Sequence, residues 1–304
     1  MKYSQEQVSA YLARISFASR KCKPITPETV RSADGLNYLT TLQICHLASI
    51  PFESLSLHYS QDRNISLDEE ALFDKMVGSG SGRGGYCMEQ NLFFGTILKT
   101  MGFEIISTGA RVMGPAGYKG WDHQVLLVCM DDGVYLVDVG FGSSGPTRPI
   151  HLAHGKVVKW GATEAQSRLI YQEPPNPAFQ GLWIMEHRNT PSDEWSPKYS
   201  FGMTEFTAQD FSVMNYATST RRTCIFTFMI IASKMILDED SGDIVGAMTL
   251  SGSTIKRRIR EKSEVVVECA TEGERVAALK EHFGIILSSK EQAGIRGTVT
   301  ELKV

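Results

Sequence analysis

Hydrophobic residues in the first hundred positions recur mostly at helical spacing. Ser4 can cap a first helix, whose apolar face continues to Ile15. Thr26 followed by Pro27 is typical of a second helix start, and Pro51 ends the pattern that follows. The helices predicted for this part of the chain cover residues 4–15, 26–50, 67–77 and 88–101.

From Phe103 onwards the hydrophobic pattern changes to alternation, which is the period of a β-strand. The predicted strands cover residues 104–112, 123–130, 134–139, 157–160, 180–187, 225–232, 244–250 and 264–269. We also predict a polar, inserted loop over 189–198 and a final helix over 274–283. Helices first, strands next and a mixed end favour an α+β fold over a doubly wound sheet.

The composition is that of an ordinary folded chain. The length of 304 residues predicts roughly two domains, with three small ones possible. Hydrophobic residues make up 42% and charged residues 21%, which argues against a disordered chain. The net charge of −3 gives no electrostatic footprint for nucleic acid or for an anionic membrane. We therefore expect neither of these as a partner.

The sequence predicts no membrane span and no secretion signal. The N-terminal segment carries Lys2, Glu6 and Arg14 and lacks the apolar core of a signal peptide. The longest apolar run, 224–232, is far shorter than the roughly 20 residues that a span needs. Six cysteines are scattered without Cys-x-x-Cys pairs, as in a reducing compartment. These features predict a cytoplasmic enzyme.

A glycine-rich loop over 78–85 precedes the helix predicted from residue 88. Its Gly-x-Gly-x-x-Gly spacing matches a dinucleotide-binding pattern, but the loop follows a helix instead of a strand, and no phosphate-loop lysine comes after it. The residue that this loop places at the helix start is Cys87. A helix N-terminus stabilises a thiolate over a thiol. Cys87 is therefore the candidate nucleophile, with a buried structural cysteine as the alternative.

A thiolate nucleophile needs a base and a group that orients the base. His123 opens an apolar predicted strand, and Asp138 lies on the next one. If the turn between these strands is Asp131–Asp132, Asp138 pairs opposite Val125 and lies diagonal to His123 on the same face. A turn one residue later would put Asp138 too far away. The hypothesis of a Cys-His-Asp triad thus also predicts a strand register.

Two other patterns give only weak indications of a functional site. His151 and His154 have helical metal-ligand spacing, but no further ligands lie near them in the sequence, so we predict no metal site. The basic run over 256–262 lies on a strand-like segment and is interpreted as a solvated face, given the net charge.

Several motifs, in order along most of the chain, resemble those of the arylamine N-acetyltransferase family. The most specific is Arg-Gly-Gly-Tyr-Cys-x-Glu-Gln-Asn over 83–91, which contains Cys87. The full set covers Tyr11–Ile15, Leu39–His46, Ile50–His58, Arg83–Asn91, His123–Val128, Val137–Gly142 and Asp210–Thr220. Independent motifs in the right order make chance agreement improbable.

The resemblance implies an α+β fold of three domains. These are a helical domain over 1–102 that carries the nucleophile, an antiparallel β-barrel-like domain over 103–217 that carries the histidine and aspartate, and an α/β lid over 218–304. It also implies ping-pong transfer of an acetyl or other short acyl group from acyl-coenzyme A to arylamines, arylhydroxylamines or arylhydrazines. Detoxification of xenobiotics, a monomeric state and no tightly bound cofactor follow from the same resemblance.

The resemblance also implies roles for individual residues. The triad is Cys87, His123 and Asp138. Coenzyme A contacts are expected at Gly120, Gly142 and Thr223, and acceptor contacts at Phe52, Val112 and Phe141. Glu53 and Arg83 match a pair that we interpret as structural, a carboxylate and a guanidinium that anchor the loop bearing the cysteine.

The chain departs from the family pattern at two positions. Ser54 replaces the more usual asparagine, and Arg222 stands where proline is common. Arg221 and Arg222 could add positive charge near a phosphate or an acyl carboxylate. The inserted polar loop suggests a eukaryotic or fungal type of member.

Two other functions fit the same residues. A papain- or transglutaminase-like cysteine amidase uses the same Cys-His-Asp order, because water can replace the amine as acyl acceptor. A degenerate relative would only bind aromatic ligands. The acyl donor also stays open among acetyl-, propionyl- and malonyl-coenzyme A.

Overall fold

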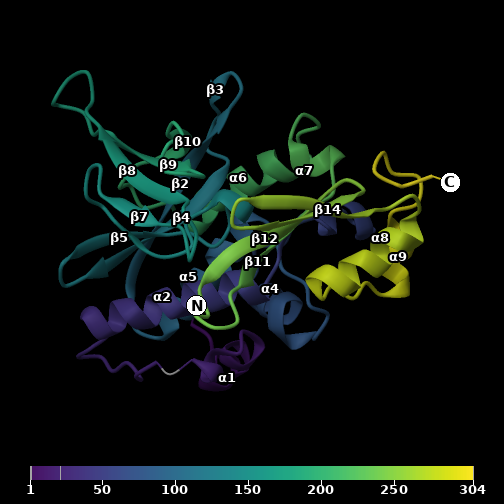
Figure 1. Ribbon diagram of the computed structural model, residues 1–304, viewed down its shortest axis with the longest axis horizontal. Coiled ribbons are helices and arrows are strands. Elements are labelled where there is room, and N and C mark those ends of the chain that lie inside the picture. Colours follow the sequence, from purple (N-terminus) through teal and green to yellow (C-terminus); the bar gives the residue numbers. More distant parts are fainter. Residues whose placement is uncertain (1, 21, 304) are drawn as a thin grey trace.

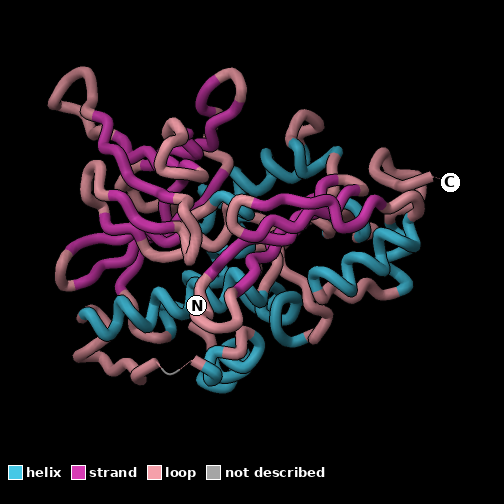
Figure 2. The backbone as a smooth tube through the Cα atoms, in the orientation of Figure 1, coloured by secondary structure: helices cyan, strands magenta, loops and turns pink. Residues whose placement is uncertain are grey.

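The computed structural model describes residues 2–20 and 22–303, and in it the helices of the N-terminal part lie together beneath two sheets (Figures 1 and 2). These helices are α1 Gln5–Arg14, η1 Phe17–Ser19, α2 Ala33–Ser49, α3 Ser56–Tyr59, α4 Glu69–Phe73, η2 Asp74–Gly78 and α5 Cys87–Thr100. The four predicted helical stretches appear as α1, α2, α4 with η2, and α5, although α2 starts later than predicted, and the short helices η1 and α3 were not predicted.

Local hydrogen bonds decide where the first helices begin. The side chain of Ser4 caps α1, as predicted. The start predicted at Thr26 is wrong, because α2 begins at Ala33. The Thr26 carbonyl instead accepts the N–H groups of Thr29 and Val30 and closes a turn. The Thr29 side chain accepts the N–H of Thr26 in this turn and so competes with a helix for a backbone group. The Thr-Pro pair alone did not reveal this competition.

The middle of the chain forms a curled antiparallel sheet. Its strands are β2 Glu104–Gly114, β3 Gly117–Tyr118, β4 His123–Met130, β5 Gly133–Val137, β6 Ile150–His151, β7 Val157–Lys159, β8 Gln166–Gln172, β9 Leu182–Arg188 and β10 Ser196–Phe201. They lie in the order β6-β5-β4-β2-β10-β9-β8-β7, with β3 paired to β2. Contacts between β6 and β8 bring the sheet close to a closed barrel (Figure 1). The polar loop predicted over 189–198 is shorter than expected, because β10 begins at Ser196.

A second antiparallel sheet, in the order β1-β11-β12-β13-β14, combines one strand from the N-terminal part of the chain with four from the C-terminal part. Its strands are β1 Phe52–Glu53, β11 Ile231–Leu237, β12 Ile244–Ser251, β13 Thr254–Ile259 and β14 Lys262–Glu268. The remaining helices are η3 Gly142–Ser144, α6 Ala208–Thr220, α7 Ile225–Phe228, α8 Glu272–Ala278, η4 Leu279–Phe283 and α9 Ser289–Gly294. Because β1 comes from the helical part, this sheet holds the segment before Cys87 against the C-terminal part.

Two expectations for the C-terminal part are wrong. The apolar run 225–232 is not one strand, because α7 occupies its first half and β11 begins only at Ile231. The Ile225 carbonyl accepts the N–H of Met229 and so closes a helical turn. The helix over 274–283 forms as α8 and η4, but it is not the last one, since α9 follows it.

The helix that begins at Cys87 is part of the main hydrophobic core. Four of its apolar side chains, Phe93, Phe94, Ile97 and Leu98, are fully buried. Burying side chains of this size stabilises the fold by roughly 1.5–3 kcal/mol each. Cys87 therefore stands on a rigid element.

No helix within residues 2–20 and 22–303 is long and apolar enough to cross a membrane. The first strand of the barrel begins at Glu104, and α6 ends at Thr220. An element therefore begins just after position 102, whereas position 217 lies inside α6, and the division into three domains at those positions remains a prediction.

Candidate active site

Cys87 is the first residue of α5, as the glycine-rich loop predicts. A Cβ on Gly84 would lie 1.7 Å from the carbonyl oxygen of Pro51, so only glycine lets the loop pass there. The carboxylate of Glu89 accepts the N–H of Tyr86 at 3.0 Å and satisfies one donor at the helix start. The path of the loop and the start of the helix are thus both fixed.

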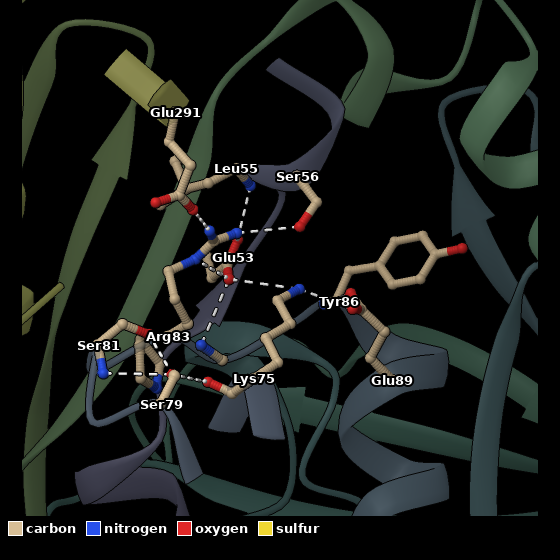
Figure 3. Close-up of polar contacts among 12 residues, drawn as sticks. Glu53, Leu55, Ser56, Lys75, Ser79, Ser81, Arg83, Tyr86, Glu89 and Glu291 are labelled. Atoms are coloured by element: carbon tan, nitrogen blue, oxygen red, sulfur yellow. Dashed lines mark hydrogen bonds and ion pairs between the residues drawn. The ribbon is translucent and has the colours of Figure 1, made fainter. Parts of the chain in front are cut away.

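A buried ion pair anchors the loop in front of Cys87 (Figure 3). Arg83 donates to both carboxylate oxygens of Glu53, from Nε at 2.9 Å and from Nη2 at 3.3 Å. The same guanidinium donates to Glu291 at 2.5 Å and to the hydroxyl of Ser56 at 3.0 Å. Arg83 and Glu53 therefore form the bidentate anchor that the resemblance implies, with α9 and α3 as further supports.

Lys75 extends this cluster towards the helix start (Figure 3). Its ammonium lies 2.7 Å from Glu89 and 3.6 Å from Glu53. Burial by itself would raise the pKa of Glu53, but Arg83 and Lys75 lower it to about 2. For Glu89 burial dominates and raises the pKa, although Lys75 opposes the change. Glu53 is thus the ionised centre of the anchor.

The strand register that brings His123 and Asp138 together is confirmed. Met130 pairs with Gly133, so the turn is the predicted one and the register continues to place Asp138 opposite Val125. His123 Nε2 and Asp138 Oδ2 lie 2.8 Å apart. Both side chains are almost completely buried.

The carboxylate of Asp138 has further donors. Its Oδ1 accepts from Asn91 Nδ2 at 2.9 Å and from the N–H of Gly140 at 2.8 Å. Burial alone would raise the pKa of Asp138, but His123 and these hydrogen bonds lower it. An ionised carboxylate only accepts hydrogen bonds, so Nε2 of His123 carries a proton. In the neutral ring, Nδ1 is then the acceptor nitrogen.

The chain segments at Asp122 and Gly140 pack against Cys87. Its Sγ lies 3.7 Å from the carbonyl oxygen of Asp122, and a Cβ on Gly140 would lie 2.7 Å from the Cys87 Cα. Burial raises the pKa of the Cys87 thiol, and Asp122 and Asp138 raise it further. This direction is opposite to the one expected from the helix end alone. A thiolate at this position therefore needs a cation beside it.

Cys87 and His123 open on one cavity of about 470 Å³, and Asp138 lies behind His123. Five of the six contact residues expected from the resemblance line this cavity: Phe52, Val112, Phe141, Gly142 and Thr223. Gly120 is not among its lining residues, although its neighbour Lys119 is.

The cavity has further lining residues that the sequence did not single out. They are chiefly Lys119, Asp122, Cys224 and Phe226. Three of them, Lys119, Asp122 and Cys224, are chain neighbours of residues already expected at the site, which is the signal that could have found them. Of the two adjacent arginines, Arg221 lines the cavity and Arg222 does not.

The other buried histidines lie in the packed interior of the protein. His46 lies between the hydroxyl of Tyr11 at 3.1 Å and the amide of Gln90 at 2.7 Å. Burial lowers the pKa of His46, His58 and His187 to about 4, so these rings are neutral at pH 7. Within the described ranges, no group of three or more His, Cys, Asp or Glu side chains could hold a metal ion.

The position of Ser54 explains why it can replace asparagine. Its hydroxyl accepts the N–H of Ile231 at 3.1 Å, and its own N–H donates to the Ile231 carbonyl at 3.0 Å. A short polar side chain therefore fulfils the local need where β1 meets β11.

Comparison with known proteins identifies relatives over nearly the whole chain. A family model described as N-acetyltransferase matches residues 35–292. The N-malonyltransferase FDB2 of Fusarium pseudograminearum is 36% identical, with 97% of this chain and 92% of the relative aligned. The pineal gland isozyme NAT-3 of arylamine N-acetyltransferase from Gallus gallus is 27% identical over 93% of this chain and 95% of the relative.

Solved structures show the same fold. The arylamine N-acetyltransferase from Salmonella typhimurium superposes with a TM-score of 0.79 at 25% identity, over 96% of this chain and 98% of the other. The Mycobacterium marinum enzyme in complex with CoA gives a TM-score of 0.76 at 26% identity, over 96% and 99%. The expected α+β architecture is thereby confirmed.

Proposed function

We propose that this chain, which belongs to the arylamine N-acetyltransferase family, transfers a short acyl group from acyl-coenzyme A to an aromatic amine through an acyl-cysteine on Cys87. Membership of the family makes the chain an acyltransferase and argues against the cysteine amidase alternative. The single observation that carries the proposal is the placement of Cys87 and His123 on one cavity, with the ionised Asp138 hydrogen-bonded behind the ring.

In the first half-reaction, His123 Nδ1 takes the proton of the Cys87 thiol. The resulting imidazolium is the cation that the buried thiolate needs, and Asp138 stabilises it. The thiolate attacks the thioester carbonyl of acyl-coenzyme A. Coenzyme A leaves as a thiolate and takes the proton from His123, which leaves acyl-Cys87. Breaking one thioester and forming another is nearly balanced in energy, so activation and positioning are the main tasks of the protein.

In the second half-reaction, the aromatic amine attacks acyl-Cys87. Arylamines are weak bases and are mostly unprotonated at neutral pH, so their nitrogen is already nucleophilic. His123 accepts the proton of the amine and returns it to the Cys87 sulfur as the amide leaves. Phe52, Val112 and Phe141 line the cavity and offer the apolar surface that an aromatic ring requires.

The Mycobacterium marinum relative was solved in complex with CoA, which supports a coenzyme A donor for this chain. We propose Gly142 and Thr223 as contacts, since both line the cavity beside Cys87. Gly142 has a φ of +73°, a conformation that favours glycine, so no side chain covers its backbone at the cavity. Gly120 remains a proposed contact through its position next to Lys119.

The roles in the cell rest on the sequence alone. We propose detoxification of aromatic amines in the cytoplasm by a monomeric enzyme. The partners are two small molecules, an acyl-coenzyme A donor and an aromatic amine acceptor.

Steady-state kinetics test the proposal. With acetyl- or malonyl-coenzyme A and an arylamine varied together, double-reciprocal plots should be parallel, as for ping-pong transfer. Replacing Cys87 by Ser should lower kcat/KM by at least about 10³-fold. Cys129→Ser is the matched control, because Cys129 is half-buried on β4 and does not line the cavity. Retained activity in Cys87→Ser, or equal loss in both variants, would refute Cys87 as the nucleophile.

A further inference from the structure

The charges that line the cavity are not balanced. Its charged lining residues are Lys119, Asp122 and Arg221, which gives two cations and one carboxylate. The carboxylate is already engaged, since Asp122 Oδ1 accepts the N–H of Val112 at 3.0 Å and its Oδ2 lies 3.9 Å from Lys119 Nζ. One positive charge, that of Arg221, is left over.

The Arg221 side chain has no hydrogen bond or ion pair within residues 2–20 and 22–303, although its backbone is well held. Its N–H donates to Ala217 at the end of α6, and its carbonyl accepts the N–H of Cys224 at 2.8 Å and the hydroxyl of Thr227 at 3.1 Å. A cation at a helix C-terminus interacts favourably with the helix dipole, but this needs no position on a cavity wall. Arg221 is exposed and lines the cavity, so its guanidinium is free to contact a ligand there.

The guanidinium acts on the part of the cavity that contains the nucleophile. Burial raises the pKa of Asp122, and Arg221 is among the cations that oppose this change. Asp122 is also the residue whose carbonyl oxygen lies 3.7 Å from Cys87 Sγ. Because Arg221 and Cys87 also line the same cavity, an anionic group held by Arg221 would share this cavity with the acyl group on Cys87.

From these contacts we infer that Arg221 recognises a carboxylate on the acyl group, so that the preferred donor is a carboxylated acyl-coenzyme A of the malonyl class. This inference rests on the proposed function, of which it specifies the donor. A guanidinium can bind a carboxylate through two parallel hydrogen bonds. The relatives named N-malonyltransferase, 36% and 34% identical to this chain, agree with a donor of this kind.

The half-reaction is balanced in atoms and charge. The Cys87 thiolate attacks the thioester carbonyl of malonyl-coenzyme A, the carbon–sulfur bond to coenzyme A breaks, and malonyl-Cys87 forms. The proton that His123 took from Cys87 goes to the leaving coenzyme A thiolate. The free carboxylate of the malonyl group keeps its charge throughout and stays on Arg221.

The experiment measures this half-reaction alone, without amine, by quenched flow and intact mass spectrometry. Malonyl- and propionyl-coenzyme A are the probes, because their acyl groups have the same length and differ in the terminal carboxylate. Wild type should acylate faster with malonyl-coenzyme A at limiting donor. In Arg221→Gln, the second-order rate with malonyl-coenzyme A should fall about tenfold or more, while the propionyl rate stays within about twofold. Arg221→Lys should fall between, since it keeps the charge but loses the paired donors.

Arg222→Gln is the matched control, because Arg222 is exposed, adjacent and outside the cavity lining. It should leave both rates within about twofold. Equal loss with both donors in Arg221→Gln would overturn the inference and indicate a contact to the phosphates of coenzyme A.

Even if Arg221→Gln fails to fold, the ratio of the wild-type acylation rates with malonyl- and propionyl-coenzyme A tests the preferred donor. Equal rates with malonyl- and propionyl-coenzyme A would overturn the inference and leave the proposed function intact. No acyl adduct with either donor would overturn the proposed function itself, and the inference with it.

Discussion

Two groups of charged side chains flank Cys87, and they are partnered to different degrees. The first is the anchor cluster of the loop that bears Cys87, which is mostly buried and closed by its own ion pairs and consists of Glu53, Lys75, Arg83, Glu89 and Glu291 (Figure 3). The second is the set of cavity charges Lys119, Asp122 and Arg221, which have one long contact of 3.9 Å among them.

The pKa of the central carboxyl differs from its ordinary value in opposite directions in the two groups. Arg83 and Lys75 overcome burial and lower the pKa of Glu53 to about 2. Burial dominates at Asp122 and raises its pKa. A closed cluster stabilises its own ionised groups and so holds the loop. An open cluster leaves charge available for a ligand, which is how a binding site differs from a structural one.

The largest expected effect on activity comes from replacing Asp138. Its carboxylate has hydrogen-bond partners, as the anchor cluster does, but it supports His123 at the cavity. Asp138→Asn removes the charge that orients and stabilises protonated His123. We expect kcat/KM to fall by roughly 10³- to 10⁴-fold. The pH dependence of Cys87 alkylation by iodoacetamide should shift as well, which a purely structural role would not produce. An activity loss below tenfold would contradict the role of Asp138.

The anchor cluster should dominate stability. Arg83→Met leaves Glu53 buried without its main partner, and we expect the free energy of unfolding to fall by about 3–5 kcal/mol in urea titrations. Arg221→Met is the matched control on the cavity side, where the guanidinium has no protein partner among the described residues. Its unfolding free energy should change by less than about 0.5 kcal/mol. Similar losses in the two variants would break the comparison.

Lowering the pH should change the stability contributions of the Glu53 and Asp122 carboxyls in opposite directions. The pKa of Glu53 is lowered from 4.5 to about 2, so its stabilising contribution is present above pH 4.5 and is lost as the pH falls towards 2. The advantage of wild type over Glu53→Gln should shrink by on the order of 1 kcal/mol between pH 4.5 and 3.5.

For Asp122 the pKa is raised, so its contribution to stability is present below pH 3.8 and is lost as the pH rises. Wild type should therefore lose stability relative to Asp122→Asn as the pH rises from 3.8. Urea unfolding across pH 3.5–7 checks both slopes. Slopes of the same sign would show that the two clusters do not differ as described.

The smallest expected effect concerns donor choice. Asp122 carries the one acidic side chain among the residues lining the cavity in the described part of the chain, and its negative charge repels a carboxylated acyl group. Asp122→Asn should raise the ratio of malonyl to propionyl acylation rates by about two- to fivefold. Arg221→Gln should move the same ratio the other way. A lower ratio in Asp122→Asn would contradict the assigned charge pattern.

Much of this site could be predicted from local patterns. Glycines before an apolar helix placed Cys87 at a helix start, and counting residues from the two possible turns showed that only one of them gives the register that joins His123 to Asp138. Both predictions depend on short stretches of backbone with few alternatives. The side-chain period of two in a strand makes a wrong register easy to recognise.

Other features depend on contacts that a sequence does not display. The apolar run 225–232 divides into α7 and β11, because apolar composition alone does not distinguish a short buried helix from a strand. Which of Arg221 and Arg222 reaches the cavity depends on where α6 ends. The pKa of Cys87 depends on burial by the Gly140 and Asp122 segments, which outweighs the helix end that the sequence indicates.

The most direct test of acyl transfer through Cys87 is the intact mass of the protein mixed with acyl-coenzyme A and no amine. Wild type and Cys129→Ser should gain the mass of one acyl group, peptide mapping should place it on Cys87, and adding an arylamine should remove it. Cys87→Ala should gain none. An adduct of the same size in Cys87→Ala, or on another residue of wild type, would contradict the account.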